Sequence, residues 1–237
     1  MQLIDDNTLE RSTVVANCRM NRERRLTGGN GYARELAFHP LDVLTDTLTR
    51  AGRASWLDLC CGTGRALIEA AQRLQAEGLD ARVEIVGVDL VGMFDEVGGE
   101  LNGLRLVEAS LSRWRPVRAF DLVTCVHGLH YVGDKLGLIA RAASWLTEDG
   151  LFVANLDLAN FKFADGRPAG RPVAVLLRRA GLEYDRRRRL VLCQGRRAVN
   201  LPYRYLGADD QAGPNYTGQP AVDSHYEPGP IHQRDPA

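Results

Sequence analysis

One run of residues, from Asp58 to Arg65, has the types and spacing of a ligand-binding turn. It reads Asp-Leu-Cys-Cys-Gly-Thr-Gly-Arg and stands between an apolar stretch typical of a strand and a stretch with helical periodicity. Gly62 and Gly64 allow a ligand to approach the backbone closely, and amides at the start of the following helix can face its polar atoms. The sequence therefore predicts a nucleotide-type site at this turn.

Two carboxylates near the turn indicate which ligand it holds. Asp89 ends the next apolar stretch, where a carboxylate can accept hydrogen bonds from both hydroxyls of a ribose. A dinucleotide site has a third glycine where this chain has Leu67, and Asp58 would repel a pyrophosphate. S-adenosylmethionine has no phosphate and carries an ammonium group, so an acid beside it is favourable. The charge of Asp58 thus favours S-adenosylmethionine over NAD.

Two histidines follow a later apolar stretch, in the run from Cys125 to Tyr131. In an open α/β sheet, the carboxyl ends of the strands line the ligand crevice. Histidine suits proton abstraction near neutral pH, so His127 and His130 are candidate catalytic bases. The alternative is structural, in which one of the pair caps the next helix or packs in the core.

The elements that must position these groups alternate along the chain. Short apolar runs predict strands over residues 56–60, 83–88, 104–107, 120–126 and 151–156. Helical periodicity predicts helices over residues 66–74, ending at Gly78, and over residues 136–146. Glycines make residues 91–101 a poor helix, so we expect an irregular crossover there. This order predicts an α/β fold with a mostly parallel sheet and helices on both faces.

The flanking segments are expected to complete and cover that sheet. Residues 171–181 read as a helix, and Gln194-Gly195 reads as the turn of a closing β-hairpin. Residues 1–52 are expected to form a helical N-terminal lid, with a helix that begins at His39-Pro40. Residues 53–206 are then the binding core, and the proline-rich residues 207–237 are an irregular tail or a flap.

Composition and charge exclude several classes of protein. The 237 residues are 45% hydrophobic and 25% charged, which argues against a wholly disordered chain. The 30 basic and 30 acidic residues cancel, so bulk charge gives no reason to expect a nucleic-acid partner, and no apolar run is long enough to span a bilayer. The five cysteines include no Cys-x-x-Cys spacing, and the first residues lack a signal-peptide pattern. We therefore expect a cytoplasmic protein without a metal site or a membrane partner.

In their order and spacing, these motifs resemble those of the class I S-adenosylmethionine-dependent methyltransferases of the small-molecule type. The similarity covers roughly residues 54–157. The run from Asp58 to Gly64 matches the first motif of the family, with Cys60 where a glycine is common. Asp89 matches its ribose-binding acid, and Ser110 replaces an aspartate that would accept from the adenine amino group.

The resemblance also implies which residues contact each ligand. For the cofactor S-adenosylmethionine they are Asp58, Cys60, Gly62, Gly64, Asp89, Leu90, Ser110, Leu111, Val126 and His127. For the methyl acceptor they are His130, Tyr131 and, from the lid, Tyr32.

The fold implied is a Rossmann-like seven-stranded sheet with an antiparallel last strand, which the Gly195 hairpin would supply. The chemistry implied is an SN2 transfer of a methyl group from a sulfonium, in which alignment is the main contribution of the enzyme. A general base matters only if the acceptor must lose a proton. We therefore expect transfer to an oxygen or nitrogen of a small-molecule acceptor, such as a specialised metabolite.

Two other functions stay open. One is a protein of this fold that binds S-adenosylmethionine without transferring methyl, as a cyclase or a regulatory subunit. The other is an RNA methyltransferase that uses Arg186–Arg189 as its electrostatic footprint, although such a run more often forms a solvated face of a hairpin strand.

Overall fold

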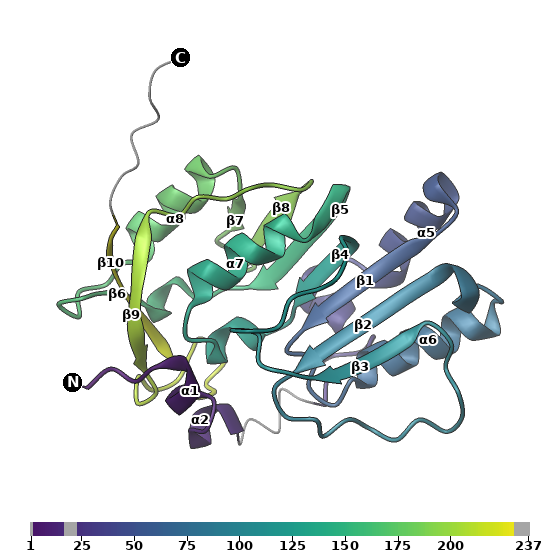
Figure 1. Cartoon of the computed structure of the whole chain (residues 1–237), viewed down its shortest axis with the longest axis horizontal. Helices are drawn as coiled ribbons and strands as arrows, with labels where there is room; N and C mark the ends of the chain where they lie inside the picture. Colours follow the sequence, from purple (N-terminus) through teal and green to yellow (C-terminus); the bar gives the residue numbers. More distant parts are fainter. Residues whose placement is uncertain (1, 17–22, 230–237) are drawn as a thin grey trace, which may run out of the picture.

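The centre of the molecule is a seven-stranded sheet with the order β3-β2-β1-β4-β5-β8-β7, in a computed structural model that describes residues 2–16 and 23–229 (Figure 1). Its strands are β1 Ala54–Leu59, β2 Val83–Asp89, β3 Leu104–Glu108, β4 Phe120–Cys125, β5 Leu146–Asn155, β7 Glu183–Asp185 and β8 Leu190–Gln194. The first five strands pair in parallel, and β8 runs antiparallel to both β5 and β7. The predicted fold class is therefore confirmed.

Alternate side chains of the strands pack into two separate cores, one on each face of the sheet. The four helices that cover it are α5 Pro40–Ala51, α6 Arg65–Ala76, α7 Lys135–Ser144 and α8 Gly170–Arg179. Trp56 packs on one face with residues of α5 and α6, and Leu57 packs on the other with residues of α7 and α8. Every residue of β1 is buried, as expected for a parallel strand covered on both sides.

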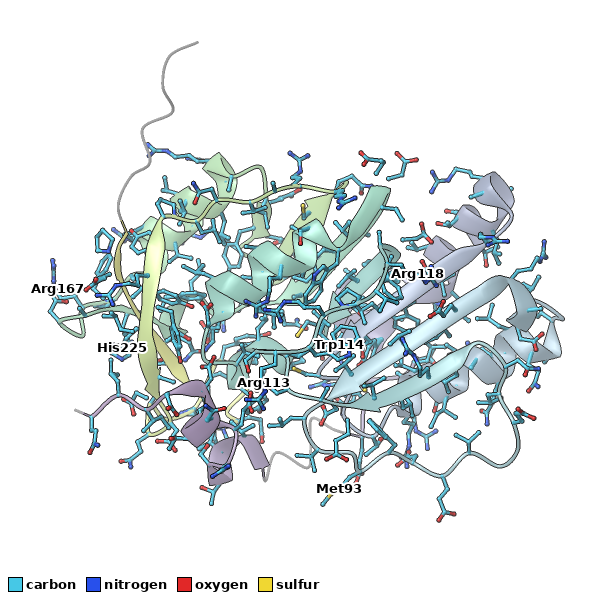
Figure 2. The ribbon with its side chains drawn as sticks, viewed as in Figure 1. Met93, Arg113, Trp114, Arg118, Arg167 and His225 are labelled. Atoms are coloured by element: carbon cyan, nitrogen blue, oxygen red, sulfur yellow. The ribbon has the colours of Figure 1, made fainter. Side chains whose placement is uncertain are left out.

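The connection between β2 and β3 is a long loop, as the glycines of this segment predict. Residues 90–103 contain no helix, and Met93, which Figure 2 labels on this loop, is 69% exposed. A three-residue 3₁₀ helix, η1 Asp80–Arg82, precedes β2. No helix of the described residues is long and apolar enough to cross a membrane.

A second, three-stranded sheet stands at the end of the molecule away from β3 (Figure 1). Its strands are β6 Phe161–Phe163, β9 Tyr203–Asp209 and β10 Asp223–Pro228, in the order β6-β10-β9, and η3 Leu158–Asn160 leads into it. His225, labelled in Figure 2, lies on β10. Residues 207–209 and 223–228 are strand, which contradicts an irregular tail there, whereas the alternative of a flap stays a prediction. The boundary expected after residue 206 falls inside β9.

The predicted hairpin at Gln194-Gly195 is also wrong. Gly195 has φ +76° and directs the chain out of the sheet after β8, and β9 then pairs with β10. The tight turn lies instead between β7 and β8, where the Asp185 carboxylate accepts from the amides of Arg187 and Arg188 at 2.8 and 3.0 Å. The run Arg186–Arg189 therefore forms a turn and not a strand face.

The N-terminal segment packs on the second sheet as well as on the core. Its short helices are α1 Asp6–Leu9, α2 Thr13–Ala16 and α4 Tyr32–Leu36. Ile4 forms a bridge with Ala208 of β9, and Leu9 joins a small apolar cluster with Ala208 and Val222. The helix predicted to begin at His39-Pro40 is α5, with Pro40 in its first turn.

Candidate functional site

A cavity that is partly open to solvent lies at the carboxyl ends of β1, β2 and β4. It is lined by residues that follow these strands and by residues of α1, α2 and α7. They are Asp6, Leu9, Glu10, Val15, Cys60, Gly62, Asp89, Leu90, Leu111, Ser112, Val126, His127, Gly128, Tyr131, Val132, Gly133, Asp134 and Arg141. The crevice is thus at the edge of the sheet that the sequence predicts.

The glycine turn after β1 contributes backbone to this cavity. Cys60 and Gly62 line it, with φ +58° and +62°, and the left-handed conformation is strained at the non-glycine residue. Gly64 does not line it. Gly64 has φ +76° at the N-cap of α6, and a Cβ there would lie 2.8 Å from a methyl group of Leu106.

Asp89 holds a fixed position in the cavity wall. Its Oδ2 accepts from the Gly62 amide at 2.9 Å, and its Oδ1 accepts from the Val91 amide at 3.0 Å. The residue is 7% exposed. These two hydrogen bonds from backbone amides fix the orientation of the carboxylate beside the glycine turn.

Asp58 lies outside the cavity wall, in contrast to its expected contact with the ligand. Its carboxylate is fully buried and accepts from the Tyr32 hydroxyl at 2.7 Å and from the Thr124 hydroxyl. Burial raises the pKa of Asp58 to about 7, although these two hydrogen bonds oppose that change. Both oxygens are engaged by the protein, so this carboxylate supports the turn from behind.

Tyr32 is likewise directed to the core and not to the cavity. It is 3% exposed, and its ring packs edge-on against Trp56 at 6.1 Å between centroids. The Trp56 indole donates to Thr124 at 2.7 Å and so completes one buried network with Asp58. This network joins α4 to β1 and β4.

Two residues after β3, Ser110 and Leu111, are predicted to contact the cofactor, and one of them lies at the cavity. Leu111 lines it, as does its neighbour Ser112. Ser110 does not, because its hydroxyl donates to Glu10 of the N-terminal segment and lies 2.6 Å from the Ser112 hydroxyl.

The segment after β4 supplies a histidine residue of the cavity wall. Val126, His127, Gly128 and Tyr131 all line the cavity, the last two from the 3₁₀ helix η2 Gly128–Tyr131. His127 has φ +58°, and its Nε2 lies 2.8 Å from Oε2 of Glu35 on α4. Val126, His127 and Tyr131 thus lie at the cavity, and their contacts with cofactor or acceptor stay a prediction.

His130 lies behind this wall. It is fully buried, and neither ring nitrogen has a hydrogen-bond partner among the described residues. Its ring centroid lies 5.5 Å from that of His127 and 5.4 Å from that of Tyr216. Burial holds the pKa of His130 well below its ordinary value, so the ring is neutral. The structural alternative suits His130 better than a catalytic role.

Acidic side chains outnumber basic ones on the cavity wall, and most of them were not predicted from sequence motifs. Asp6 and Glu10 come from the first helical segment, Asp134 from the N-cap of α7, and Arg141 is the one guanidinium of the described lining. The contact of Asp6 with this wall depends on the docking of α1 against β9. Local periodicity does not encode such a long-range contact.

In the described part of the chain, no group of three or more His, Cys, Asp or Glu side chains could hold a metal ion. Cys60, Cys61, Cys125 and Cys193 are free thiols.

Comparison with known proteins gives two kinds of match. A protein-family model described as "Methyltransferase domain" matches residues 30–194. A curated protein, "Aklanonic acid methyltransferase DauC" of Streptomyces sp. (strain C5), is 32% identical over 101 residues. That match covers 40% of this chain and 44% of the relative, so the chain spans less than half the length of this relative.

Solved structures match over about half of the chain. S-adenosylmethionine-bound CalS10, an amino pentose methyltransferase from Micromonospora echinaspora, is 22% identical, with 59% of this chain and 55% of that chain covered and a TM-score of 0.39. The sugar N-methyltransferase KedS8 from Streptoalloteichus sp ATCC 53650 is 23% identical, with 50% and 47% covered and a TM-score of 0.36.

Proposed function

The chain belongs to the methyltransferase domain family, and we propose that it transfers the methyl group of S-adenosylmethionine to an oxygen or nitrogen of a small molecule. The proposal rests on the cavity at the strand ends. The carboxylate of Asp89 is fixed in its wall, and the lining has more acidic than basic side chains. A sulfonium cation suits such a wall, whereas the pyrophosphate of a dinucleotide would be repelled by it.

The residues of the cavity fit the parts of this cofactor. The Asp89 carboxylate, fixed in the wall, is the acceptor for the ribose hydroxyls, and the apolar side chains of Leu90 and Leu111 offer a surface for adenine. Cys60 and Gly62 contribute the turn beside the amino-acid part, and Val126 and His127 line the cavity next to that turn. When bound, S-adenosylmethionine supplies an electrophilic methyl group.

The same cavity supports a small acceptor. Its wall is completed by Leu9 and Val15 of the N-terminal segment and by Tyr131 of η2, so the acceptor would be recognised inside a limited volume. The partial relative, named for methylation of aklanonic acid, agrees with a small-molecule substrate. We assign Tyr131 to the acceptor side and His127 to the place where the acceptor meets the cofactor.

Calorimetry with S-adenosylmethionine and S-adenosylhomocysteine tests the cofactor site. We expect micromolar binding, weakened about tenfold or more in Asp89→Asn, because hydrogen bonds to a charged group contribute about 1.5–3 kcal/mol. Asp46→Asn, an exposed carboxylate on α5, is the matched control and should bind like the wild type. Absent binding, or equal binding by both variants, would contradict the proposed site.

A transfer assay with methyl-labelled cofactor tests the reaction itself. The acceptors are a panel of phenols, amines and carboxylic acids, and the product is S-adenosylhomocysteine together with a labelled acceptor. Tight binding without any demethylated cofactor would favour the non-methylating alternative. RNA binding that weakens steeply with salt, and is lost when Arg186–Arg188 are neutralised, would favour the RNA alternative.

A further inference from the structure

Two side chains in contact, the half-buried Glu35 and the buried His127, bear on which imidazole nitrogen can accept a proton. His127 Nε2 lies 2.8 Å from Glu35 Oε2, and the imidazole is 1% exposed. The other carboxylate oxygen of Glu35 accepts from Arg24 at 3.2 Å, and Arg24 also donates to Asn30 at 2.6 Å. Glu35 is thus anchored on the side away from the imidazole.

Charges around the pair favour an ionised Glu35 and a neutral His127. The hydrogen bond from His127 lowers the pKa of Glu35, and burial lowers the pKa of His127 against the opposing effect of Glu35. A neutral imidazole beside a carboxylate must donate through Nε2, because an ionised carboxylate only accepts. The lone pair of His127 is then on Nδ1.

Nδ1 of His127 has no hydrogen-bond partner among the described residues, although it is buried. An unsatisfied buried acceptor costs free energy, which a donor group from a ligand would recover. His127 is also one of four described non-glycine residues with positive φ, a strain typical of functional positions.

We propose that Glu35 is a positioning residue that fixes the Nε2–H tautomer of His127, so that Nδ1 accepts a proton from the methyl acceptor. This inference rests on the proposed methyl-transfer function and narrows its substrate class. The acceptor is a hydroxyl, a phenol or an amine that must lose a proton, and not a carboxylate that is already ionised.

The proposed step balances in atoms and charge. The acceptor oxygen or nitrogen forms a bond to the methyl carbon as the carbon–sulfur bond breaks, with that electron pair going to sulfur. The acceptor proton moves to His127 Nδ1, and the imidazolium that results is stabilised by the Glu35 carboxylate. His127 later releases the proton to water, which restores the pair.

Nuclear magnetic resonance of the ring nitrogens tests the pair without any acceptor. In the wild-type protein with S-adenosylhomocysteine, we expect His127 at pH 7.5 to be neutral with its proton on Nε2. Glu35→Gln should move the titration of His127 to lower pH, because a negative neighbour is lost. Glu77→Gln, an exposed glutamate at the end of α6, is the matched control. A wild-type ring that is protonated on Nδ1 would overturn the proposal even if Glu35→Gln fails to fold.

The groups that face His127, and that bear on its titration, come from several elements. Glu35 and Arg24 belong to the N-terminal segment, His130 to η2 and Tyr216 to the loop before β10. The thiol of Cys60 lies next to Gly128, beside His127. Because the variant changes Glu35 alone, the other groups are the same in both proteins.

Kinetics with an acceptor from the transfer assay give the second measurement. We expect Glu35→Gln to lower kcat about tenfold to a hundredfold, since general-base catalysis contributes typically 10²–10⁴-fold. The KM for S-adenosylmethionine should stay within about twofold, the acidic limb of the pH profile should move to lower pH, and Glu35→Asp should recover part of kcat. If kcat and the pH profile are unchanged in Glu35→Gln while S-adenosylhomocysteine binding is normal, the proposed role of Glu35 is refuted but the proposed function is not. Failure of the wild type to bind S-adenosylhomocysteine would instead refute the function.

Discussion

The buried carboxylate of Asp58 should make the stability of the protein depend on pH in a defined way. Asp58 is fully buried below the glycine turn and accepts from the hydroxyls of Tyr32 and Thr124. Burial raises its pKa from 3.8 to about 7. The perturbation is Asp58→Asn, which keeps the shape of the side chain and removes its charge.

The magnitude follows from proton linkage. Between pH 3.8 and about 7 the folded chain binds more protons than the unfolded chain, so the contribution of Asp58 to stability falls as pH rises. The full difference is ~4 kcal/mol, at about 1.4 kcal/mol per pH unit. An asparagine lacks this dependence, but it loses the capacity to accept at its nitrogen, which costs about 1 kcal/mol.

Urea unfolding at several pH values from 4.5 to 8 measures this effect. Asp58→Asn should be about as stable as the wild type at pH 4.5 and more stable at pH 8, by roughly 3 kcal/mol. The other titrating groups are shared by both proteins, so their effects cancel in the difference between the two unfolding free energies. Asp46→Asn, at an exposed position of α5, should show no such divergence with pH.

A difference in unfolding free energy between Asp58→Asn and the wild type that stays constant from pH 4.5 to 8 would refute this reasoning. So would a difference that grows in the opposite direction, with the variant losing stability as pH rises. Either result would mean that Asp58 is ionised in the folded protein throughout this range.

Three further changes test other parts of the structure. Burial lowers the pKa of Lys135 from 10.5 to about 7, so between these pH values the folded chain binds fewer protons than the unfolded chain. In urea unfolding, the wild type should therefore gain stability relative to Lys135→Met as pH rises from 7 to 10. Gly128→Ala puts a Cβ 2.4 Å from Cys60 Cβ, so it should lower the free energy of unfolding by about 1–3 kcal/mol. It should also weaken S-adenosylhomocysteine binding in calorimetry. Gly98→Ala is the control, because its Cβ meets no atom within 4 Å. Tyr226→Phe removes a buried hydroxyl that accepts from an amide in the first turn of α7, and thermal unfolding should show a loss of about 1–3 kcal/mol.

The core of the fold was predictable because its signals are local. The strand at Trp56, the glycine turn and the helix after it each depend on residues within a few positions of one another, and each forms as expected. Gly78 ends its helix with φ +68°, which glycine adopts without strain.

The termini were less predictable because their partners are distant in sequence. Tyr203 begins a strand that pairs with β10, some twenty residues later, and not with its neighbour β8. Asp185 is a local indication of the observed turn, since an aspartate that accepts from the following amides commonly forms a turn. The sequence prediction placed the hairpin turn at Gly195 instead. Tyr32 and Glu35 share a face of one short helix, but their partners lie 26 and 92 residues away.

The charge of the cavity wall favours a cationic ligand, but it comes from residues other than Asp58, on which the sequence prediction relied. Asp58 has both oxygens engaged by protein hydroxyls and is half neutral near pH 7, so it contributes little charge to the cavity. Asp89 and Asp134 supply most of the negative charge of the wall instead, because Glu10 is paired with Arg113 at 3.6 Å and burial raises the pKa of Asp6. The described lining residues include one guanidinium, that of Arg141. Because a sulfonium loses its charge when the methyl group leaves, this wall would favour the methylated cofactor over its product. Neutralising Asp89 should therefore weaken S-adenosylmethionine binding more than S-adenosylhomocysteine binding, and equal losses for both ligands would show that the wall does not act through charge.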